Sequence, residues 1–494
     1  FCDSYGRGES ACDLGQILCA GTCVDPRTNV GYCGARDSCR GASAGVVCAD
    51  GAVCMGGVCR RGPVWAEPRL IDGPGAKGGL YPDVAVRADG SAVVVWVEMY
   101  PRDPNAPGDA VWLNRYHPST GWGMAELVEA NLTEPYYPRV VSDRTGNITV
   151  TWASIVRGIS FTWLKRYEPA TGWGPAFRPV TSRGVGHTSA GRLAMAPDGS
   201  TFAVWPQNIT QGTGTLFYTR HTASSGWSSA VQLNLPGALD VLGGDVEFDA
   251  DGSAVFVWAE SNGSRYSVWS RRLSPTSGLE PAPVLLEEED DLEAKDPDLA
   301  FDSAGNAVVV WSAGLDSTVG QRDGESIWAR VYRPACGWDA PVLLGRGTFA
   351  HHPRVAMGRA GQAVVVWRAS QVEQRQSGAP ADVWHAELDV SRGWTAAVML
   401  ASDAVGEVDM PVVSMDGDGN ALVVWSQSTG LNGSIWAARR DRTTGWREPQ
   451  KLYVSEDYEP PWNPAVQFAG NGDATITWHT SRFIPRTIWV RQYH

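Results

Sequence analysis

The sequence predicts an all-β protein: an eight-bladed β-propeller formed by residues 62–494, preceded by a small disulfide-rich module of residues 1–61. Three observations lead to this fold. One strand-and-turn unit recurs eight times, the two chain ends each hold part of one unit, and cysteines crowd the first 60 residues. Because 43% of the 494 residues are hydrophobic and 19% are charged, the chain can bury a large core.

The first element is the cysteine-rich module, which holds nine of the ten cysteines. So short and polar a segment buries too little apolar surface to fold unaided, and disulfides would limit the freedom of its unfolded chain. Disulfides need an oxidising compartment, so we expect a secreted or cell-surface protein whose signal peptide has already been removed. The nine are Cys2, Cys12, Cys19, Cys23, Cys33, Cys39, Cys48, Cys54 and Cys59.

Nine cysteines cannot all pair with one another, and the tenth is Cys336, 277 positions beyond Cys59. A fifth disulfide from Cys336 would join the module to the propeller. The alternatives are a free Cys336 or a lipid-modified Cys2. Zinc binding competes with disulfides for clustered cysteines, but few of the spacings here match zinc knuckles.

The repeated unit is recognised by a short strand that ends in tryptophan, at intervals of 53 to 58 residues. Residues 92–96 (AVVVW) and 363–367 (AVVVW) are β-branched runs typical of a strand buried on both faces. A turn such as Asp-Gly-Ser precedes the strand, and its glycine supplies the positive φ of a tight hairpin. The eight tryptophans are Trp96, Trp152, Trp205, Trp258, Trp311, Trp367, Trp425 and Trp478.

Two further strands complete each unit. A third strand follows the tryptophan, as in residues 327–332 (IWARVY), and a Gly-Trp turn such as Gly337-Trp338 opens a fourth. Four antiparallel strands every fifty-odd residues are typical of a propeller blade. A closed ring also protects the sheet edges that a linear stack would expose.

The chain ends predict how the ring closes. The last unit stops after its third strand at His494, while Trp65-Ala-Glu-Pro68 stands alone before the first full unit and matches Trp446-Arg-Glu-Pro449. We therefore expect residues 64–71 to pair with residues 487–493 and complete the eighth blade.

Both parts of the chain resemble known repeats. The pattern C-x-G-x-C-V-D from Cys19, followed by Cys33-Gly34 and a closing G-G-x-C at Cys59, resembles the cysteine-rich modules related to stigma-specific proteins. The units D-G-N-A-V-V-V-W, I-W-A-R-Y and T-G-W resemble a repeat of secreted bacterial β-propeller proteins. These resemblances imply extracellular placement and the propeller fold, and they bring no catalytic residues.

The candidate site lies where the loops entering the innermost strands gather around the channel. Seven residues before each turn glycine stands an aligned column: Asp83, Arg139, Arg192, Asp245, Asp298, Arg354, Val412 and Ala465. The residues just before this column are largely polar or aromatic: Tyr81, Tyr137, His187, Asp296, His351, His352, Asp409, Trp462 and Asn463. We predict ligand binding by Tyr81, Tyr137, Arg139, His187, Arg192, His352, Arg354, Trp462 and Asn463.

The column and its neighbours each allow two interpretations. Blades one and two, three and four, and five and six place an Asp beside an Arg, which indicates ion pairs between blades. Alternatively, the three arginines capture a carboxylate or sulfate. The aromatic residues either pack blades together or stack on sugar rings.

No cofactor and no metal site are predicted. His351 and His352 near Asp296 and Asp409 offer a weak metal hypothesis. The acidic run Glu287-Glu-Glu-Asp-Asp291 is either a solvated loop or a calcium site. The Asp249 and Asp416 segments are interpreted as turns because no distal glutamate stands at calcium-loop spacing.

Composition narrows the function. A formal charge of −13 argues against nucleic acid as a partner, and no 18-residue apolar run predicts a transmembrane helix. The leading hypothesis is a secreted, lectin-like or adhesive protein that recognises a glycan or a protein at the channel face. The alternatives are an extracellular polysaccharide lyase or glycosidase, and a structural component of a cell-surface assembly. Because no H-E-x-x-H motif is present, a binding protein is favoured over an enzyme.

Overall fold

The structure is a computed structural model, and every element in its described residues is a β-strand. It divides into two compact units, residues 1–67 with 492–494 and residues 68–491. The described residues are 17–19, 22–24, 26, 31–36, 39–40, 43–47, 52–55, 58–61, 65–72, 78–99, 108–156, 159–180, 191–196, 198–207, 213–249, 251–288, 292–314, 325–370, 381–402, 407–428, 432–455, 460–480 and 486–494.

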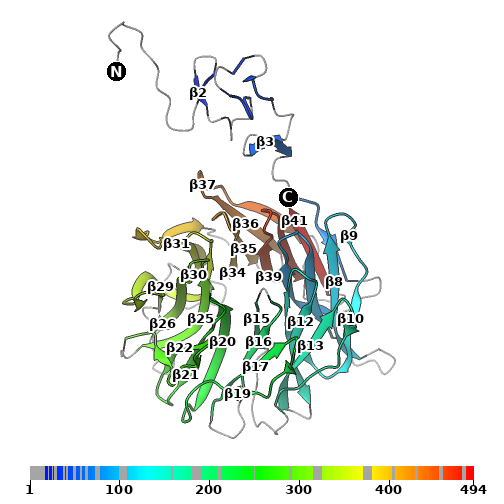
Figure 1. Ribbon diagram of the computed structural model, residues 1–494, viewed down its shortest axis with the longest axis vertical. Coiled ribbons are helices and arrows are strands. Elements are labelled where there is room, and N and C mark those ends of the chain that lie inside the picture. Colours follow the sequence, from blue (N-terminus) through cyan, green and yellow to red (C-terminus); the bar gives the residue numbers. More distant parts are fainter. Residues whose placement is uncertain are drawn as a thin grey trace. The chain divides into compact units, whose positions relative to one another are not determined.

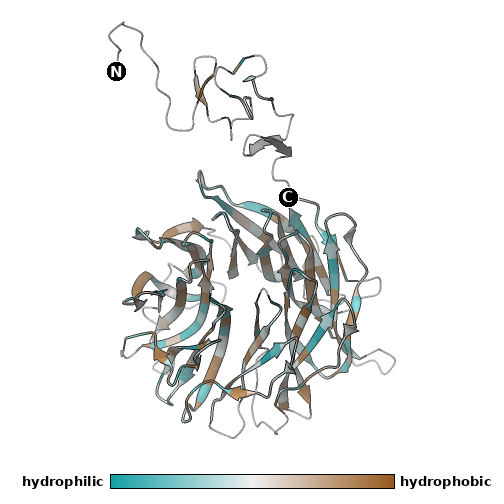
Figure 2. Ribbon diagram, in the orientation of Figure 1, coloured by the Kyte–Doolittle hydropathy of each residue, from teal (hydrophilic) through white to brown (hydrophobic). Residues whose placement is uncertain are grey.

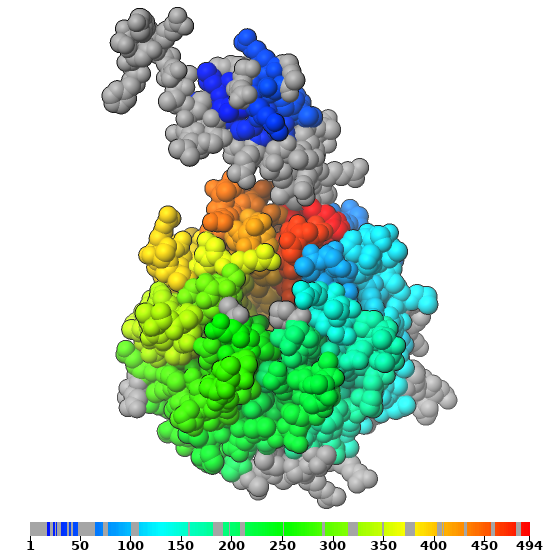
Figure 3. All heavy atoms as spheres, viewed as in Figure 1, coloured from blue at the N-terminus to red at the C-terminus, as the bar shows by residue number. Residues whose placement is uncertain are grey.

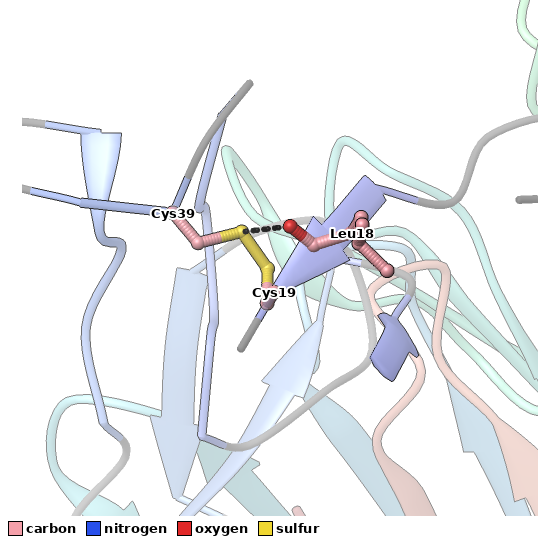
Figure 4. Close-up of a disulfide and its surroundings, with 3 residues drawn as sticks. All are labelled: Leu18, Cys19 and Cys39. Atoms are coloured by element: carbon pink, nitrogen blue, oxygen red, sulfur yellow. Dashed lines mark hydrogen bonds between the residues drawn. A yellow bond between two sulfur atoms is a disulfide. The ribbon is translucent and has the colours of Figure 1, made fainter. Parts of the chain in front are cut away.

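The N-terminal unit contains two short hairpins. β1 (Ile17–Cys19) pairs with β2 (Thr22–Val24), and β3 (Ala52–Met55) pairs with β4 (Val58–Arg61). A disulfide joins Cys19 to Cys39, whose Sγ lies 3.9 Å from the Leu18 carbonyl oxygen (Figure 4). Cys23 and Cys33 are disulfide-bonded as well. The predicted disulfides are thus present in the described part of this unit, and its likeness to stigma-specific modules stays a prediction.

The larger unit is the predicted eight-bladed propeller, whose sheets follow one another around a ring (Figure 1). Blades one to four comprise β6 (Gly79–Val86), β7 (Ala92–Glu98), β8 (Asp109–His117), β9 (Gly121–Trp122) and β10 (Glu126–Leu132); β11 (Pro135–Ser142), β12 (Ile148–Val156), β13 (Ile159–Glu168) and β14 (Gly172–Trp173); β15 (Arg192–Met195), β16 (Thr201–Pro206), β17 (Leu216–Thr222), β18 (Gly226–Trp227) and β19 (Val231–Gln232); and β20 (Asp240–Phe248), β21 (Ala254–Ser261), β22 (Tyr266–Ser274), β23 (Gly278–Leu279) and β24 (Val284–Leu285).

The remaining blades follow the same plan, and one long strand, β29, passes from the outer edge of blade five into the innermost position of blade six. Blades five to eight comprise β25 (Glu293–Phe301), β26 (Ala307–Gly314), β27 (Glu325–Arg333), β28 (Gly337–Trp338) and β29 (Val342–Met357); β30 (Gln362–Ser370), β31 (Asp382–Asp389), β32 (Gly393–Trp394) and β33 (Val398–Ala401); β34 (Glu407–Met415), β35 (Ala421–Ser428), β36 (Gly433–Asp441), β37 (Gly445–Trp446) and β38 (Gln450–Val454); and β39 (Pro461–Phe468), β40 (Ala474–Thr480), β41 (Thr487–Tyr493) and β5 (Arg69–Leu70).

The core of each blade is built on the repeated tryptophan, which is at most 1% exposed in all eight blades. In most blades a second tryptophan lies opposite it on the third strand, and the stacked pairs Trp152–Trp163 and Trp425–Trp436 have ring centroids 6.5 and 6.4 Å apart. Hydrophobic residues occur in the sheets all around the ring (Figure 2). Hydrophobic clusters of buried residues span neighbouring sheets, as between blades one and two and between blades five and six, which is expected for a ring of blades.

The ring closes as predicted, with strands from both chain ends in one sheet. β5 pairs with β41, where Leu70 lies opposite Trp489, and a separate bridge joins Trp65 to Tyr493. The Asp72 carboxylate accepts a hydrogen bond from the Ile488 N–H at 2.9 Å. The innermost strands contact one another in sequence from β6 to β39, and β39 contacts β6.

Long cationic side chains join the outer edges of several neighbouring blades. Lys165 donates to the Val128 carbonyl oxygen of the preceding blade at 2.6 Å, and Arg330 donates to the Leu286 carbonyl oxygen at 3.0 Å. Such side chains can bury their aliphatic stems and keep a donor for a backbone acceptor at the far end.

Cys336 and the absence of a membrane-spanning helix are two further points on which the sequence made a prediction. Cys336 is a free, exposed thiol in the described residues, which is the alternative of a free Cys336. The residue lies in the turn just before Gly337-Trp338, where its N–H donates to the Arg333 carbonyl oxygen. Within the described residues, no helix is long and apolar enough to cross a membrane.

Candidate functional site

The candidate site begins at a β-bulge in the innermost strand of each blade. In β6, Leu80 pairs with Val97 but Asp83 pairs with Val95, so two residues on β6 oppose one on β7. The same shift occurs in the innermost strands of blades two and four to eight. Six of these bulges contain a residue followed by proline, which suits an unpaired position because proline has no N–H.

The first bulge residue has a left-handed backbone in each of these seven blades, although non-glycine residues rarely adopt that conformation. The φ angles are 54° at Tyr81, 47° at Tyr137, 51° at Gly243, 53° at Asp296, 54° at His352, 38° at Met410 and 50° at Asn463. Because innermost strands run in the same direction around a propeller, these residues gather at one end of the channel. We call this set of seven residues the channel mouth. Figure 3 shows the surface hollowed at the centre of the ring.

Two tyrosines form an aromatic pair on blades one and two. The rings of Tyr81 and Tyr137 lie 4.5 Å apart, and Tyr137 is 43% exposed. Burial, followed by the neighbouring Tyr137 hydroxyl, raises the pKa of Tyr81. The edge of this pair meets His479, a buried residue of β40 whose ring is 5.9 Å from Tyr81. Burial, followed by the positive charge of Arg486, lowers the pKa of His479 to about 3, so its imidazole is neutral.

A histidine–carboxylate pair lies across the ring on blades five and six. Nδ1 of His352 is 3.4 Å from Oδ2 of Asp296, and the side chains are 32% and 43% exposed, so a ligand can reach both. Burial alone would raise the pKa of Asp296. The hydrogen bond and charge of His352, with a contribution from Arg354, outweigh burial and lower that pKa below its ordinary value.

The other predicted aromatic and polar residues are placed unevenly. Asn463 is a channel-mouth residue, while Trp462 is half-buried and lies opposite His479 in the register of β39 and β40. Their blade borders blade one, which carries Tyr81. His187 lies outside the described residues. The rings of His351 and His352 meet edge to face at 4.5 Å.

The charged column lies two residues beyond the channel mouth, and its aspartates join neighbouring blades. Asp83 accepts the Val140 N–H at 2.9 Å, and Asp298 accepts the Val355 N–H at 2.8 Å. Asp245 accepts the Leu299 N–H at 3.3 Å in the same way. Each carboxylate therefore caps a backbone donor on the next innermost strand.

This arrangement corrects the expectation of three ion pairs. Asp83 and Arg139 form one at 3.5 Å, but within the described residues neither Arg192 nor Arg354 has a carboxylate within 4 Å. Asp245 and Asp298 instead direct a carboxylate oxygen to backbone N–H groups. Capping a donor that would otherwise lack a partner outweighs a weak pairing with a flexible side chain.

The charges of the column influence one another across the channel. Burial lowers the pKa of Arg139. The Asp83 carboxylate opposes this, but the positive charges of Arg192 and Arg354 add to it, so the pKa of Arg139 is lowered overall. Burial would lower the pKa of Arg192 as well, but the carboxylates of Asp245 and Asp298 raise it overall.

Two carboxyl groups on β20 also lie in this field. Burial, partly opposed by Arg192, raises the pKa of Asp245, and burial with the Asp245 carboxylate raises the pKa of Glu247. Sequence reasoning missed Glu247 and His479 as well as the bulges. The recurring X-Pro dipeptide two positions before the charged column was the signal that could have revealed the bulges.

The acidic turns do not form calcium loops. Oδ1 of Asp416 accepts the N–H groups of Asp418 and Asn420, and Asp249 caps its own turn in the same manner. Of the acidic run, residues 289–291 lie outside the described residues, so its calcium hypothesis stays untested. Among the residues that are described, no three His, Cys, Asp or Glu side chains are grouped as metal ligands would be. Asp409 is described for its backbone alone.

Comparison with known proteins finds similar folds. No family model and no curated protein matches the chain. A protein of unknown function from Dyadobacter fermentans is similar with a TM-score of 0.43 and 10% identity, covering 88% of this chain and 100% of that one. An ulvan lyase, a polysaccharide lyase solved with a GlcA–Rha3S ligand, gives a TM-score of 0.49 and 9% identity over 86% of this chain and 95% of its own.

A third similar structure is the α-L-arabinofuranosidase of Fusarium graminearum, with a TM-score of 0.36 and 12% identity over 61% of this chain and 92% of its own. The expectation of a binding protein over an enzyme is corrected here, because the similar propellers include polysaccharide lyases and a glycosidase. At these identities the similarity concerns the fold.

Proposed function

We propose that this protein is an extracellular enzyme that binds a polysaccharide at the channel mouth and cleaves it by general acid–base catalysis. The observation that supports this most directly is the His352–Asp296 pair. Both residues are half-exposed, both have a left-handed backbone, and Nδ1 of one lies 3.4 Å from a carboxylate oxygen of the other.

The pair has the chemistry of a general base. A carboxylate that accepts a hydrogen bond from Nδ1–H holds the neutral imidazole in the tautomer whose Nε2 carries a lone pair. Because the pKa of Asp296 is lowered, this carboxylate remains ionised at neutral pH. Nε2 of His352 can then take a proton from the substrate or from a water molecule and return it to the leaving group.

The tyrosine pair supplies a binding surface away from this base. In a ring of eight blades, blades one and two lie opposite blades five and six, so Tyr81 and Tyr137 face the His352–Asp296 pair across the mouth. Aromatic faces stack on the C–H faces of sugars. A polymer that crosses the mouth would contact both pairs with different sugar units, which favours a polysaccharide over a monosaccharide.

The disulfide chemistry of the N-terminal unit supports placement outside the cell. The Cys19–Cys39 bond is stable where thiols are not kept reduced, as in secreted proteins. An enzyme in that compartment meets polysaccharides of cell walls and matrices directly.

The experiment is a cleavage assay of the purified chain on a panel of neutral and acidic polysaccharides. New reducing ends report any cleavage, and ultraviolet absorbance of an unsaturated product separates elimination from hydrolysis. Replacing a general base lowers the rate by roughly 10²–10⁴-fold, so we expect a loss of that size for His352→Ala. Asp296→Asn should lower the rate less, because the imidazole remains in place.

His117→Ala is the matched control, because His117 is an exposed histidine of β8 whose ring contacts Ser119. It should cleave as the unmodified chain does. Binding of a polysaccharide without cleavage on the whole panel, or cleavage that survives His352→Ala, would refute the proposed function.

A further inference from the structure

Two guanidinium groups in the channel have no carboxylate partner among the described residues. Arg192 on β15 and Arg354 on β29 both belong to the charged column, and neither has a carboxylate within 4 Å. Arg354 donates one hydrogen bond, to the carbonyl oxygen of its neighbour Pro353 at 2.9 Å. Both residues are half-buried, so solvent and a ligand can reach them.

The fold itself does not explain these arginines. The same column position in blades one, four and five carries aspartate, and each aspartate caps a backbone N–H of the following blade. A guanidinium group has five donors and no acceptor, so an arginine cannot take that structural role. Arg139 at least pairs with Asp83, whereas Arg192 and Arg354 lack even this partner within the described residues.

The surroundings favour a specific anionic ligand over a general attraction to negative charge. Asp83, Asp245 and Asp298 balance the three arginines at long range, and the chain as a whole carries a charge of −13. What a ligand could still meet is short-range, namely guanidinium N–H donors that no carboxylate of the described residues accepts. Such donors match the paired oxygens of a carboxylate or a sulfate.

The position of Arg354 connects these donors with the channel mouth. It lies two residues beyond His352 on β29, and its charge contributes to the lowered pKa of Asp296. An acidic group that entered the channel from a sugar held at the mouth would therefore meet Arg354 beside the His352–Asp296 pair.

We propose that Arg354 and Arg192 bind an anionic substituent, a carboxylate or a sulfate ester, of the polymer that occupies the channel mouth. The inference rests on the proposed function in taking that polymer to be a polysaccharide. It adds that the substrate is acidic, and that its acidic group points into the channel.

The test is equilibrium binding of the full chain, measured by isothermal titration calorimetry in about 0.15 M salt. The probes are polygalacturonate for carboxylates, dextran sulfate for sulfates and unmodified dextran as the neutral polymer. We expect one of the two acidic polymers to bind at least about tenfold more tightly than dextran, and that polymer identifies the acidic group.

Arg354→Gln and Arg192→Gln should each weaken that binding by roughly 10–100-fold, as expected when a charge-assisted hydrogen bond is lost. Arg354→Lys keeps the charge but lacks the planar guanidinium group, so its affinity should lie between those of the unmodified chain and Arg354→Gln. Arg144→Gln, at an exposed turn arginine, should bind as the unmodified chain does. Tryptophan fluorescence confirms that each variant is folded.

Equal affinity for neutral and acidic polymers, no binding of either acidic polymer, or unchanged binding in both glutamine variants would overturn the inference. These results are separable from those for catalysis. Selective binding that depends on Arg354 without any cleavage would refute the proposed enzyme and uphold acidic recognition. Cleavage of a neutral polymer that Arg354→Gln does not affect would uphold the proposed enzyme and refute acidic recognition.

Discussion

The left-handed backbone at the bulges of the channel mouth costs free energy when the residue is not glycine. This cost can be measured most directly at Gly243. Its φ is 51°, and a Cβ added there would meet nothing within 4 Å. Gly243→Ala therefore changes the backbone energy without a steric clash. An L-residue in this conformation costs about 1–2 kcal/mol.

The net effect includes the unfolded chain. Alanine restricts the unfolded state and by this route stabilises a protein by about 0.4–1 kcal/mol. The difference predicts that Gly243→Ala lowers the free energy of unfolding by about 1 kcal/mol.

The assay is denaturant unfolding followed by tryptophan fluorescence, for which the repeated buried tryptophans provide the signal. Gly123→Ala is the matched control. Gly123 is exposed, lacks a positive φ, and an added Cβ would make ordinary contacts at 3.5 Å or more. It should become slightly more stable. If Gly243→Ala is as stable as Gly123→Ala, the bulge stores no backbone strain and the reasoning fails.

Three further predictions concern closure, the thiol and the blade contacts. Burial raises the pKa of Asp72 from 3.8 to about 6, so the folded state holds this proton more tightly than the unfolded state does. The free energy of unfolding should therefore fall by roughly 2 kcal/mol as pH rises from 4 to 7, and unfolding curves of Asp72→Asn that parallel those of the unmodified chain at each pH would contradict this. Iodoacetamide should label Cys336 without denaturant, and a peptide map showing it unlabelled would disprove its exposure. Asp298→Ala should lower the free energy of unfolding by about 1–3 kcal/mol by removing the acceptor of the Val355 N–H, while Asp298→Asn restores much of it; equal stability of the two variants would exclude the capping role.

The repeat made most of the fold predictable. Every blade needs a buried central strand, a tight hairpin and a large side chain between sheets, so tryptophan and the turn glycine recur in register. The glycines of all eight turns have a positive φ between 76° and 90°, as the Asp-Gly pattern indicated. Closure followed because Trp65 matched the one strand that the eighth blade lacked.

The site was less predictable, because its geometry depends on backbone irregularity and on competition between hydrogen bonds. An alternating pattern assigns a side chain to one face, but the bulge at His352 changes that assignment within the strand. Pairing Asp298 with Arg354 by sequence position overlooked the backbone N–H that the carboxylate caps. The disulfide between Cys336 and the module was expected only because nine cysteines leave one without a partner. An odd count says nothing about the distance between two cysteines in the fold.

The internal repeat also separates structural residues from functional ones. Any side chain that the fold requires must recur, since every blade meets the same packing problem, and the central tryptophan does so eight times. The channel mouth behaves in the opposite way: its backbone conformation recurs, while its side chains range from Tyr137 to His352 to Met410.

A backbone geometry kept in seven described blades presents a side chain to the channel without dictating which one. The side chain at this position of each blade is then determined by the ligand in the channel and not by the fold. On this argument Met410, next to the uncharged Val412, marks a sector that the polymer does not use. Met410→Ala should therefore leave both cleavage and the binding of acidic polymers unchanged. Tyr137→Ala should weaken binding, because it removes an exposed face on which a sugar stacks. A large effect of Met410→Ala would mean that the polymer also contacts the blade of Met410, which would contradict this argument.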